Sequence, residues 1–172
     1  SAYAMMMIKA FQMDLIYYSN KRNTTLENDI QAYNEYLKKT GVLPVKVKNV
    51  TSLDEVLKEA DIISLHIPLT EKTRHLISKK EMLTMKTDAI LINTSRGPVI
   101  DEASLAEHCK VHPDFTAGLD VFEKEPVIYE GIKQLPNITI APHIASATRW
   151  TRENMAKLAA LNIKGVIEGY PL

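Results

Sequence analysis

Five residues in the second half of this 172-residue chain carry side chains that suit anion binding and proton transfer: Arg96, Asp120, Glu123, Glu125 and His143. A guanidinium can bind a planar carboxylate through two parallel hydrogen bonds. An imidazole can donate a proton to an oxygen that becomes a hydroxyl, and a carboxylate on its far nitrogen fixes its tautomer and favours its charged form. Brought together, these groups suit the reduction of a 2-oxo acid.

Each residue also has an ordinary explanation when it is taken alone. Arg96 can be a solvated loop charge, and His143, which follows Pro142, can be a structural loop residue. The two glutamates on either side of Lys124 can belong to a solvated turn. Only their convergence at one place favours a catalytic role, so the elements that carry them decide the question.

Short apolar runs alternate with helical patterns along the chain. The predicted strands are 15–18, 45–47, 62–66, 89–94, 116–119 and 138–141. The predicted helices are 1–11, 26–37 with a stop at Gly41, one behind a capping box at 52–55, 78–85, 102–110, and one from about Thr148 to Gly169. This alternation predicts an α/β fold, a doubly wound parallel sheet whose strands are buried on both faces.

The predicted strands deliver the reactive side chains to one edge of the sheet. Arg96 follows the strand 89–94, Asp120 follows 116–119, and His143 follows 138–141. Because ligands of open α/β sheets bind beyond the carboxyl ends of the strands, we expect these residues to form one site.

Composition excludes several other classes of protein. The chain has 21 basic and 21 acidic residues and no formal net charge, which argues against a nucleic-acid partner. No apolar run approaches the ~20 residues of a membrane span. A single cysteine, Cys109, excludes an internal disulfide and a multi-cysteine zinc site, and its apolar helical setting predicts burial. We expect no metal site.

The first predicted element is the helix 1–11, whereas a sheet of this type normally begins with a strand and a glycine-rich turn. We therefore expect residues 1–172 to form one NAD(P)-binding domain that is truncated at its N-terminus and lacks its first strand, its glycine-rich turn and a substrate domain. These residues alone should turn over nothing.

Three blocks of sequence resemble the signature segments of the D-isomer-specific 2-hydroxyacid dehydrogenases: 93–102, 118–126 and 141–147. The resemblance implies an oxidoreductase that transfers hydride from NAD(P)H to hydroxypyruvate or glyoxylate and yields a D-2-hydroxy acid. It implies that Arg96 binds the substrate and that His143 is the acid and base. It also implies that Glu125, rather than Glu123, pairs with that histidine.

The same resemblance implies contacts with the dinucleotide. It places Thr94, Ser95 and Asp120 near the cofactor, and it makes His66, Pro68 and Thr73 part of the cofactor wall. His75, His108 and His112 match no functional position of the family, and we expect surface or helix-end roles for them.

The segment after the first predicted strand bears on the choice of cofactor. Ser19, Asn20, Lys21 and Arg22 stand where NAD-dependent members carry an aspartate for the ribose 2′-hydroxyl. A hydroxyl that bonds a 2′-phosphate and cations that neutralise it favour NADPH over NADH. Alternatively, Lys21 and Arg22 are solvated loop charges.

Within the family, segments 26–39 and 159–171 resemble the plant-type hydroxypyruvate reductases, as does the opening Ser1-Ala2-Tyr3-Ala4. Those enzymes carry an acid after the strand and favour NADH, contrary to the cofactor argument. Two alternatives stay open: a phosphoglycerate dehydrogenase-like enzyme, and a corepressor-like protein that senses the dinucleotide. The resemblance also implies a homodimer. The expected compartment is the cytoplasm or the peroxisome, and the sequence leaves the choice between them open.

Overall fold

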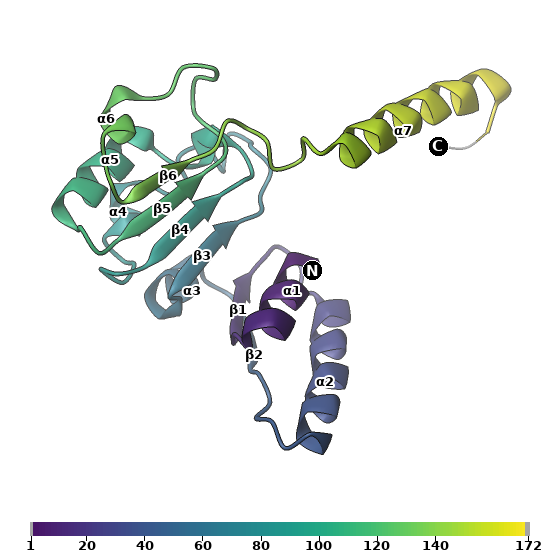
Figure 1. Cartoon of the computed structure of the whole chain (residues 1–172), viewed down its shortest axis with the longest axis horizontal. Helices are drawn as coiled ribbons and strands as arrows, with labels where there is room; N and C mark the ends of the chain where they lie inside the picture. The colour runs from purple at the N-terminus through teal and green to yellow at the C-terminus, as the bar shows by residue number, and fades with distance from the viewer. Residues whose placement is uncertain (1, 171–172) are drawn as a thin grey trace.

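The computed structural model describes residues 2–170, in which helices and strands alternate along the chain (Figure 1). The strands are β1 (Leu15–Tyr18), β2 (Val47–Val50), β3 (Ile62–Leu65), β4 (Ile90–Asn93), β5 (Thr116–Leu119) and β6 (Ile138–Ile140). The helices are α1 (Ala2–Phe11), α2 (Thr24–Lys39), α3 (Leu53–Glu59), α4 (Lys79–Met82), the 3₁₀ turn η1 (Gly97–Val99), α5 (Glu102–Val111), α6 (Glu130–Lys133) and α7 (Arg149–Glu168). These elements match the expected ones in order and type, apart from η1 and α6, which the sequence patterns did not predict.

All the strand pairs in the described residues are parallel, and they form two sheets with the orders β2-β1 and β3-β4-β5-β6. A doubly wound sheet of the dinucleotide-binding type has the order 3-2-1-4-5-6. The observed order matches it when one position is left between β1 and β3, which are not hydrogen-bonded to each other. Among residues 2–170 no strand fills that position. The expected doubly wound α/β fold is confirmed.

Strand β2 begins later than the predicted 45–47. Val45 is buried, and its N–H and carbonyl are both bonded to the side chain of Asn34 on α2, at 2.9 and 2.8 Å. Because these two hydrogen bonds hold the backbone of Val45 against α2, pairing with β1 begins two residues later, where Val47 lies opposite Leu15.

The expectation that the strands are buried on both faces is wrong for β3 and β4. Their burial alternates, with Ile63, Leu65, Leu91 and Asn93 buried while Ile62 and Ile90 are exposed. On the buried side, each helix from α3 to α6 packs against the next one along the chain. Residues of these helices and the buried strand residues form one hydrophobic cluster. The other face of these two strands is only partly covered within the described residues.

Local signals explain where the helices begin and end. The side chains of Asn23, Ser52, Asp101 and Thr148 each accept a hydrogen bond from a backbone N–H in the first turn of α2, α3, α5 and α7. Gly41 and Gly169, after α2 and α7, have a positive φ of 75°, which glycine adopts without strain. The predicted helix 78–85 is shorter, at Lys79–Met82, and Glu81 accepts from the N–H of Ser78 at 3.1 Å.

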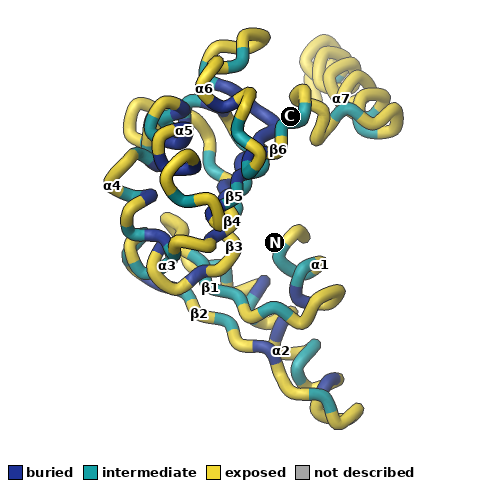
Figure 2. Tube along the Cα trace, turned by 60° about the vertical axis from the view of Figure 1, so that its left-hand side comes forward, coloured by how far each residue is buried: buried dark blue, intermediate teal, exposed yellow. Residues whose placement is uncertain are grey.

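Two hydrophobic clusters make up the core (Figure 2). The larger lies between β3–β6 and their helices and includes Cys109, 2% exposed, whose thiol pKa burial raises to about 12. The smaller joins α1, α2 and the start of β1 around Ile8 and Ile30. Burial of Cys109 is confirmed.

Helix α7 leaves the body of the domain (Figure 1), and none of its residues is buried. Met155, Leu158 and Val166, which share one stripe of the helix, are 61%, 61% and 64% exposed. Ser1 and Pro171, used above in the family resemblance, lie outside the described residues. No helix within residues 2–170 is long and apolar enough to cross a membrane. Nor does that part of the chain gather three or more metal-binding side chains.

Candidate active site

The predicted reactive residues are carried by three loops at the carboxyl ends of adjacent strands. Arg96 lies three residues after β4, Asp120 directly after β5, and His143 three residues after β6. Because β4, β5 and β6 are hydrogen-bonded neighbours, the three loops meet at one edge of the sheet, as the strand order predicts.

His143 and Glu125 form a direct pair. The ring Nδ1 lies 2.7 Å from the Glu125 Oε2, and the side chains are 47% and 35% exposed. The hydrogen bond from His143, followed by one from the Phe122 N–H to Oε1 at 3.0 Å, holds the pKa of the Glu125 carboxyl below its ordinary value. Since an ionised carboxylate only accepts, Nδ1 carries the proton, and Nε2 is left to face a reacting group.

Asp120 braces the loop that carries His143. It is 5% exposed, and its two carboxylate oxygens accept from the N–H groups of Ile144 and Ala145, each at 2.8 Å. This contact fixes the backbone directly after His143, which has a positive φ of 55°. Both oxygens are thus already bonded to the protein, and a contact of Asp120 with the cofactor stays a prediction.

The loop of Arg96 is organised by Asn93, which the sequence reasoning did not select. The fully buried Asn93 amide accepts from the Ser95 N–H at 3.0 Å and donates to the Arg96 carbonyl at 2.9 Å. The Arg96 guanidinium is exposed and donates to the Ser95 carbonyl at 2.7 Å. The loop is therefore rigid while the cationic head stays accessible, as anion binding requires. Thr94, in the same loop, is exposed.

The segment that was predicted to decide the choice of cofactor follows β1. It contacts a carboxylate that the sequence did not suggest, that of Glu27. Arg22 forms a two-pronged ion pair with Glu27 of α2, with contacts of 3.0 Å from Nε and 2.9 Å from Nη2. Glu27 also accepts from the Tyr17 hydroxyl at 2.7 Å, and these two partners, Arg22 first, lower the pKa of its carboxyl. The charge of Arg22 is thereby compensated, which weakens the argument for NADPH.

The remaining polar groups of that segment differ in their contacts. The Ser19 hydroxyl donates to the carbonyl of Lys21, whereas Asn20 and the Lys21 side chain are exposed. Of the two cations in this segment, Lys21 is exposed, whereas Arg22 is paired with Glu27.

The segment after β3 forms a closed turn. The Thr73 hydroxyl donates to the Pro68 carbonyl at 2.7 Å and accepts from the Thr70 N–H at 2.7 Å. His66 lies 2.9 Å from the Ser64 hydroxyl and packs against the Tyr3 ring of α1, and burial lowers the pKa of His66. These contacts hold 66–73 as an ordered turn beside α1, after the carboxyl end of β3. A contact of this turn with the cofactor stays a prediction.

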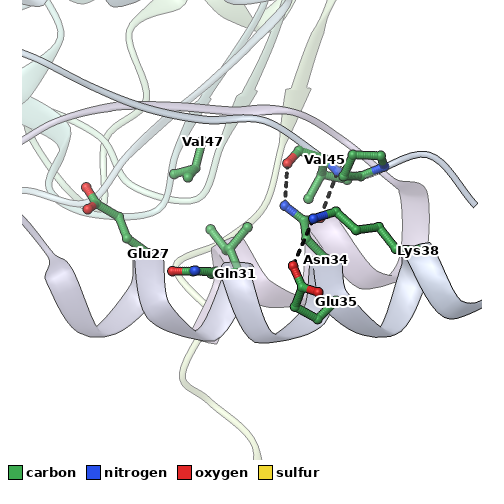
Figure 3. Close-up of a pocket in the computed structure, with 9 residues that line it drawn as sticks. Glu27, Gln31, Asn34, Glu35, Lys38, Val45 and Val47 are labelled. Atoms are coloured by element: carbon green, nitrogen blue, oxygen red, sulfur yellow. Dashed lines mark hydrogen bonds and ion pairs between the residues drawn. The ribbon is translucent and has the colours of Figure 1, made fainter.

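A hollow of about 470 Å³ lies elsewhere, between α2 and the chain leading into β2 (Figure 3). Glu27 lies at one end of it, and the ion pair of Glu35 with Lys38 lies at the other end, beside the hydrogen bonds between Asn34 and Val45. Its lining includes none of Arg96, Glu125 and His143. It lies beside the smaller core, and of the residues discussed for the site its lining includes only Glu27.

Comparisons with known proteins agree with this arrangement. The family model described as "D-isomer specific 2-hydroxyacid dehydrogenase, NAD binding domain" matches residues 2–145. A glycerate dehydrogenase of Cucumis sativus is 54% identical over 172 residues, which are 100% of this chain and 45% of that protein. A peroxisomal glycerate dehydrogenase of Arabidopsis thaliana is 52% identical over the same share of each chain.

A solved structure, a glyoxylate reductase from Paecilomyes thermophila, superposes with a TM-score of 0.82 at 32% identity. The match covers 99% of this chain and 47% of that one. This chain therefore spans somewhat less than half the length of the proteins it resembles.

Proposed function

Because this chain belongs to the NAD-binding domain family of the D-isomer specific 2-hydroxyacid dehydrogenases, we propose that it serves in the NAD(P)H-dependent reduction of hydroxypyruvate or glyoxylate to the D-2-hydroxy acid. The observation that carries the proposal is the 2.7 Å contact between Glu125 and His143, at the sheet edge where Arg96 is also presented. Relatives described as glycerate dehydrogenases and glyoxylate reductases support the substrate class.

The residues at this edge fit a dinucleotide. Donors and cations follow β1, a preformed turn follows β3, and Thr94 and Ser95 follow β4, so groups that suit the two ends of such a molecule line one edge of the strands. In this proposal Ser19, Asn20, Lys21 and Arg22 hold the adenosine end. His66, Pro68 and Thr73, with Thr94, Ser95 and Asp120, border the nicotinamide end. A reduced nicotinamide, when bound, supplies the hydride.

The chain's own residues perform the other parts of the reaction. Arg96 binds the carboxylate of the 2-oxo acid through two parallel hydrogen bonds and turns its carbonyl toward the site. His143 donates a proton from Nε2 to the carbonyl oxygen as the hydroxyl forms. Glu125 stabilises the positive charge that His143 carries before that transfer, and it keeps Nε2 directed at the substrate.

Substitution of His143 tests the proposal. In the intact enzyme that contains these residues, we expect His143→Ala to lower kcat for hydroxypyruvate reduction by ~10²–10⁴-fold, the usual contribution of a general acid, with little change in NADH affinity. Lys124→Ala, an exposed change in the neighbouring loop, should retain the rate. A His143→Ala protein that keeps the wild-type kcat would contradict the assignment.

Three finer points belong to the same proposal. The preferred cofactor is NADPH, supported by the absence of an acid at Ser19 and by the exposed cation of Lys21. The oligomer is a homodimer, supported by the uncovered apolar side chains of α7, and light scattering tests it. The compartment is the cytoplasm or the peroxisome, and the peroxisomal designation of the Arabidopsis relative supports the second.

A further inference from the structure

Glu123 lies two residues before Glu125 and is fixed through both its main chain and its side chain. The Glu102 N–H donates to the Glu123 Oε1 at 2.9 Å, and the Glu123 N–H donates to the Glu102 Oε1 at 2.7 Å. The other Glu123 oxygen lies 3.0 Å from the Nε2 of His75. Three separate contacts therefore converge on one residue for which neither the proposed reaction nor the dinucleotide has a use.

The two partners of Glu123 are themselves firmly placed. Glu102 is the first residue of α5 and is 5% exposed, so its N–H and carboxylate are part of a capped helix end. His75 has a positive φ of 49°, and its N–H donates to the Pro98 carbonyl at 2.7 Å. The two contacts with Glu102 are partly buried, whereas the contact with His75 lies at the surface, where the His75 side chain is 40% exposed and that of Glu123 18%. Breaking a contact with Glu102 would leave a partly buried polar group without a substitute partner.

The backbone that Glu123 holds also carries a donor to Glu125, one residue earlier in the chain. The Phe122 N–H, directly before Glu123, donates to the Glu125 Oε1 at 3.0 Å. The Glu125 Oε2 is thereby turned to His143, at 2.7 Å. If the backbone at 122–123 rotated, this donor would turn away, and the carboxylate would lose the contact that sets its orientation.

We propose that Glu123, held by Glu102 and His75, is a positioning residue that keeps the loop 122–125 in the one conformation in which Glu125 accepts from His143. The inference rests on the proposed function for its catalytic meaning, but the geometry it describes can be tested without turnover. It assigns a role to His75, which matches no functional position of the family.

The direct test is the tautomer of His143, read from the ¹⁵N shifts of its imidazole in the purified protein. In the wild type, Nδ1 should carry the proton, and in Glu125→Gln that signal should be lost. We expect Glu123→Ala to move the His143 signals toward those of Glu125→Gln, whereas the control Lys124→Ala keeps the wild-type pattern. Wild-type signals in a folded Glu123→Ala protein would overturn the proposal.

Kinetics provide the second test, through the coupling of two substitutions. In the intact enzyme that contains these residues, we expect Glu123→Ala alone to lower kcat about 10-fold, as a small misplacement of a catalytic group does, with KM for the cofactor unchanged. In a Glu125→Gln background it should change kcat by less than about twofold, because the group that it positions is already disabled. Additive losses in the double variant would show that Glu123 acts independently of Glu125, against the proposal.

Two further variants guard against a failure to fold. Glu123→Gln keeps an oxygen that can accept from the Glu102 N–H and should retain most of the wild-type tautomer signal and rate. His75→Asn removes only the contact of His75 with Glu123 and should have an intermediate effect on the tautomer of His143. A wild-type tautomer in His75→Asn would count against a role for His75. Should Glu125→Gln and His143→Ala both keep full activity, the proposed function fails, while the tautomer experiment still decides the positioning.

Discussion

Gly97 lies so close to Phe122 that a Cβ atom built on the glycine would be 1.9 Å from the Phe122 carbonyl carbon and 2.0 Å from its oxygen. The loop that presents Arg96 therefore packs, backbone on backbone, against the loop that presents Glu125. Because the obstructing atoms belong to the main chain, no side-chain rotation can make room. This single contact joins the substrate-binding and proton-transfer parts of the proposed site.

Gly97→Ala should force the two loops apart. We expect it to destabilise the protein by about 3 kcal/mol, the upper range for overpacking in a rigid setting, as measured by urea unfolding. Gly118→Ala is the matched control, because the nearest atom to its new Cβ would be a side-chain carbon of Ile92 at 4.0 Å. Similar losses in the two variants would show that the contact at Gly97 is not a tight one.

Arg96→Lys should separate substrate binding from cofactor binding. A lysine keeps the charge but lacks the planar pair of donors, so kcat/KM of the intact enzyme for hydroxypyruvate should fall about 10- to 100-fold, the size of a lost charge-assisted hydrogen bond. The dissociation constant for NADH should stay within about twofold, since the proposed role of Arg96 is toward the carboxylate. Arg152→Lys, an exposed change on α7, is the control. Equal losses in NADH binding and in turnover would speak against a substrate-specific role.

Glu27→Gln should shift the cofactor preference toward NADPH. The amide keeps an acceptor for the Tyr17 hydroxyl but removes the charge that holds Arg22, so the guanidinium can turn to a 2′-phosphate. We expect binding of 2′,5′-ADP, measured by calorimetry, to tighten about fivefold relative to 5′-ADP, as suits the release of an exposed ion pair. Glu35→Gln, which removes the partner of Lys38 on the same helix, should change neither. An unchanged ratio in Glu27→Gln would mean that Arg22 does not take part in cofactor choice.

Glu102 should make stability fall as pH rises. Burial, the largest cause, raises the pKa of its carboxyl above the ordinary value. A carboxyl with a raised folded-state pKa contributes stability below the unfolded pKa of about 4.3, and that contribution is lost as pH rises through the folded value. Relative to the wild type, Glu102→Gln should therefore become steadily more stable above about pH 4.3 and level off once the pH has passed the raised pKa of the folded state.

Urea midpoints of the two proteins, taken at intervals between pH 4 and 8, measure this difference. The amide oxygen that Glu102→Gln introduces would still accept from the Glu123 N–H, so the comparison isolates the charge. A constant difference across the range would show that Glu102 titrates as an exposed carboxyl does.

The sequence predicted the positions of those residues that come shortly after the end of a strand. Arg96 and His143 were selected because each follows an apolar run that could only be a buried strand, and parallel strands deliver such residues to one edge. The family resemblance chose Glu125 over Glu123, two residues apart, and the structure places Glu125 next to His143. Periodicity also placed α2 and α7 within a few residues of their observed ends.

What the sequence did not reveal depends on contacts between distant residues. Glu123 and His75 are 48 positions apart, and Glu123 and Glu102 are 21 apart, so no local pattern relates them. Asn34 displaced the start of β2 by a clamp on Val45, again across a gap of 11 residues. The partial exposure of β3 and β4 was not predicted, because Ile62 and Ile90 are apolar and their sequence pattern is the same whether or not another element covers them.

Because β1 and β3 are not hydrogen-bonded to each other, the two sheets should unfold separately. The smaller core has five buried residues and a two-stranded sheet, whereas twenty buried residues and four strands make up the larger. A two-stranded sheet is marginal by itself, and regions with few buried contacts open at low free energy. Amide hydrogen exchange should therefore resolve two cooperative units, with α1, β1, α2 and β2 exchanging through a partial opening that leaves β4 and β5 protected. The unit that opens first is the one that carries Ser19 to Arg22, so a dinucleotide bound there would slow its exchange before that of any other part of the chain.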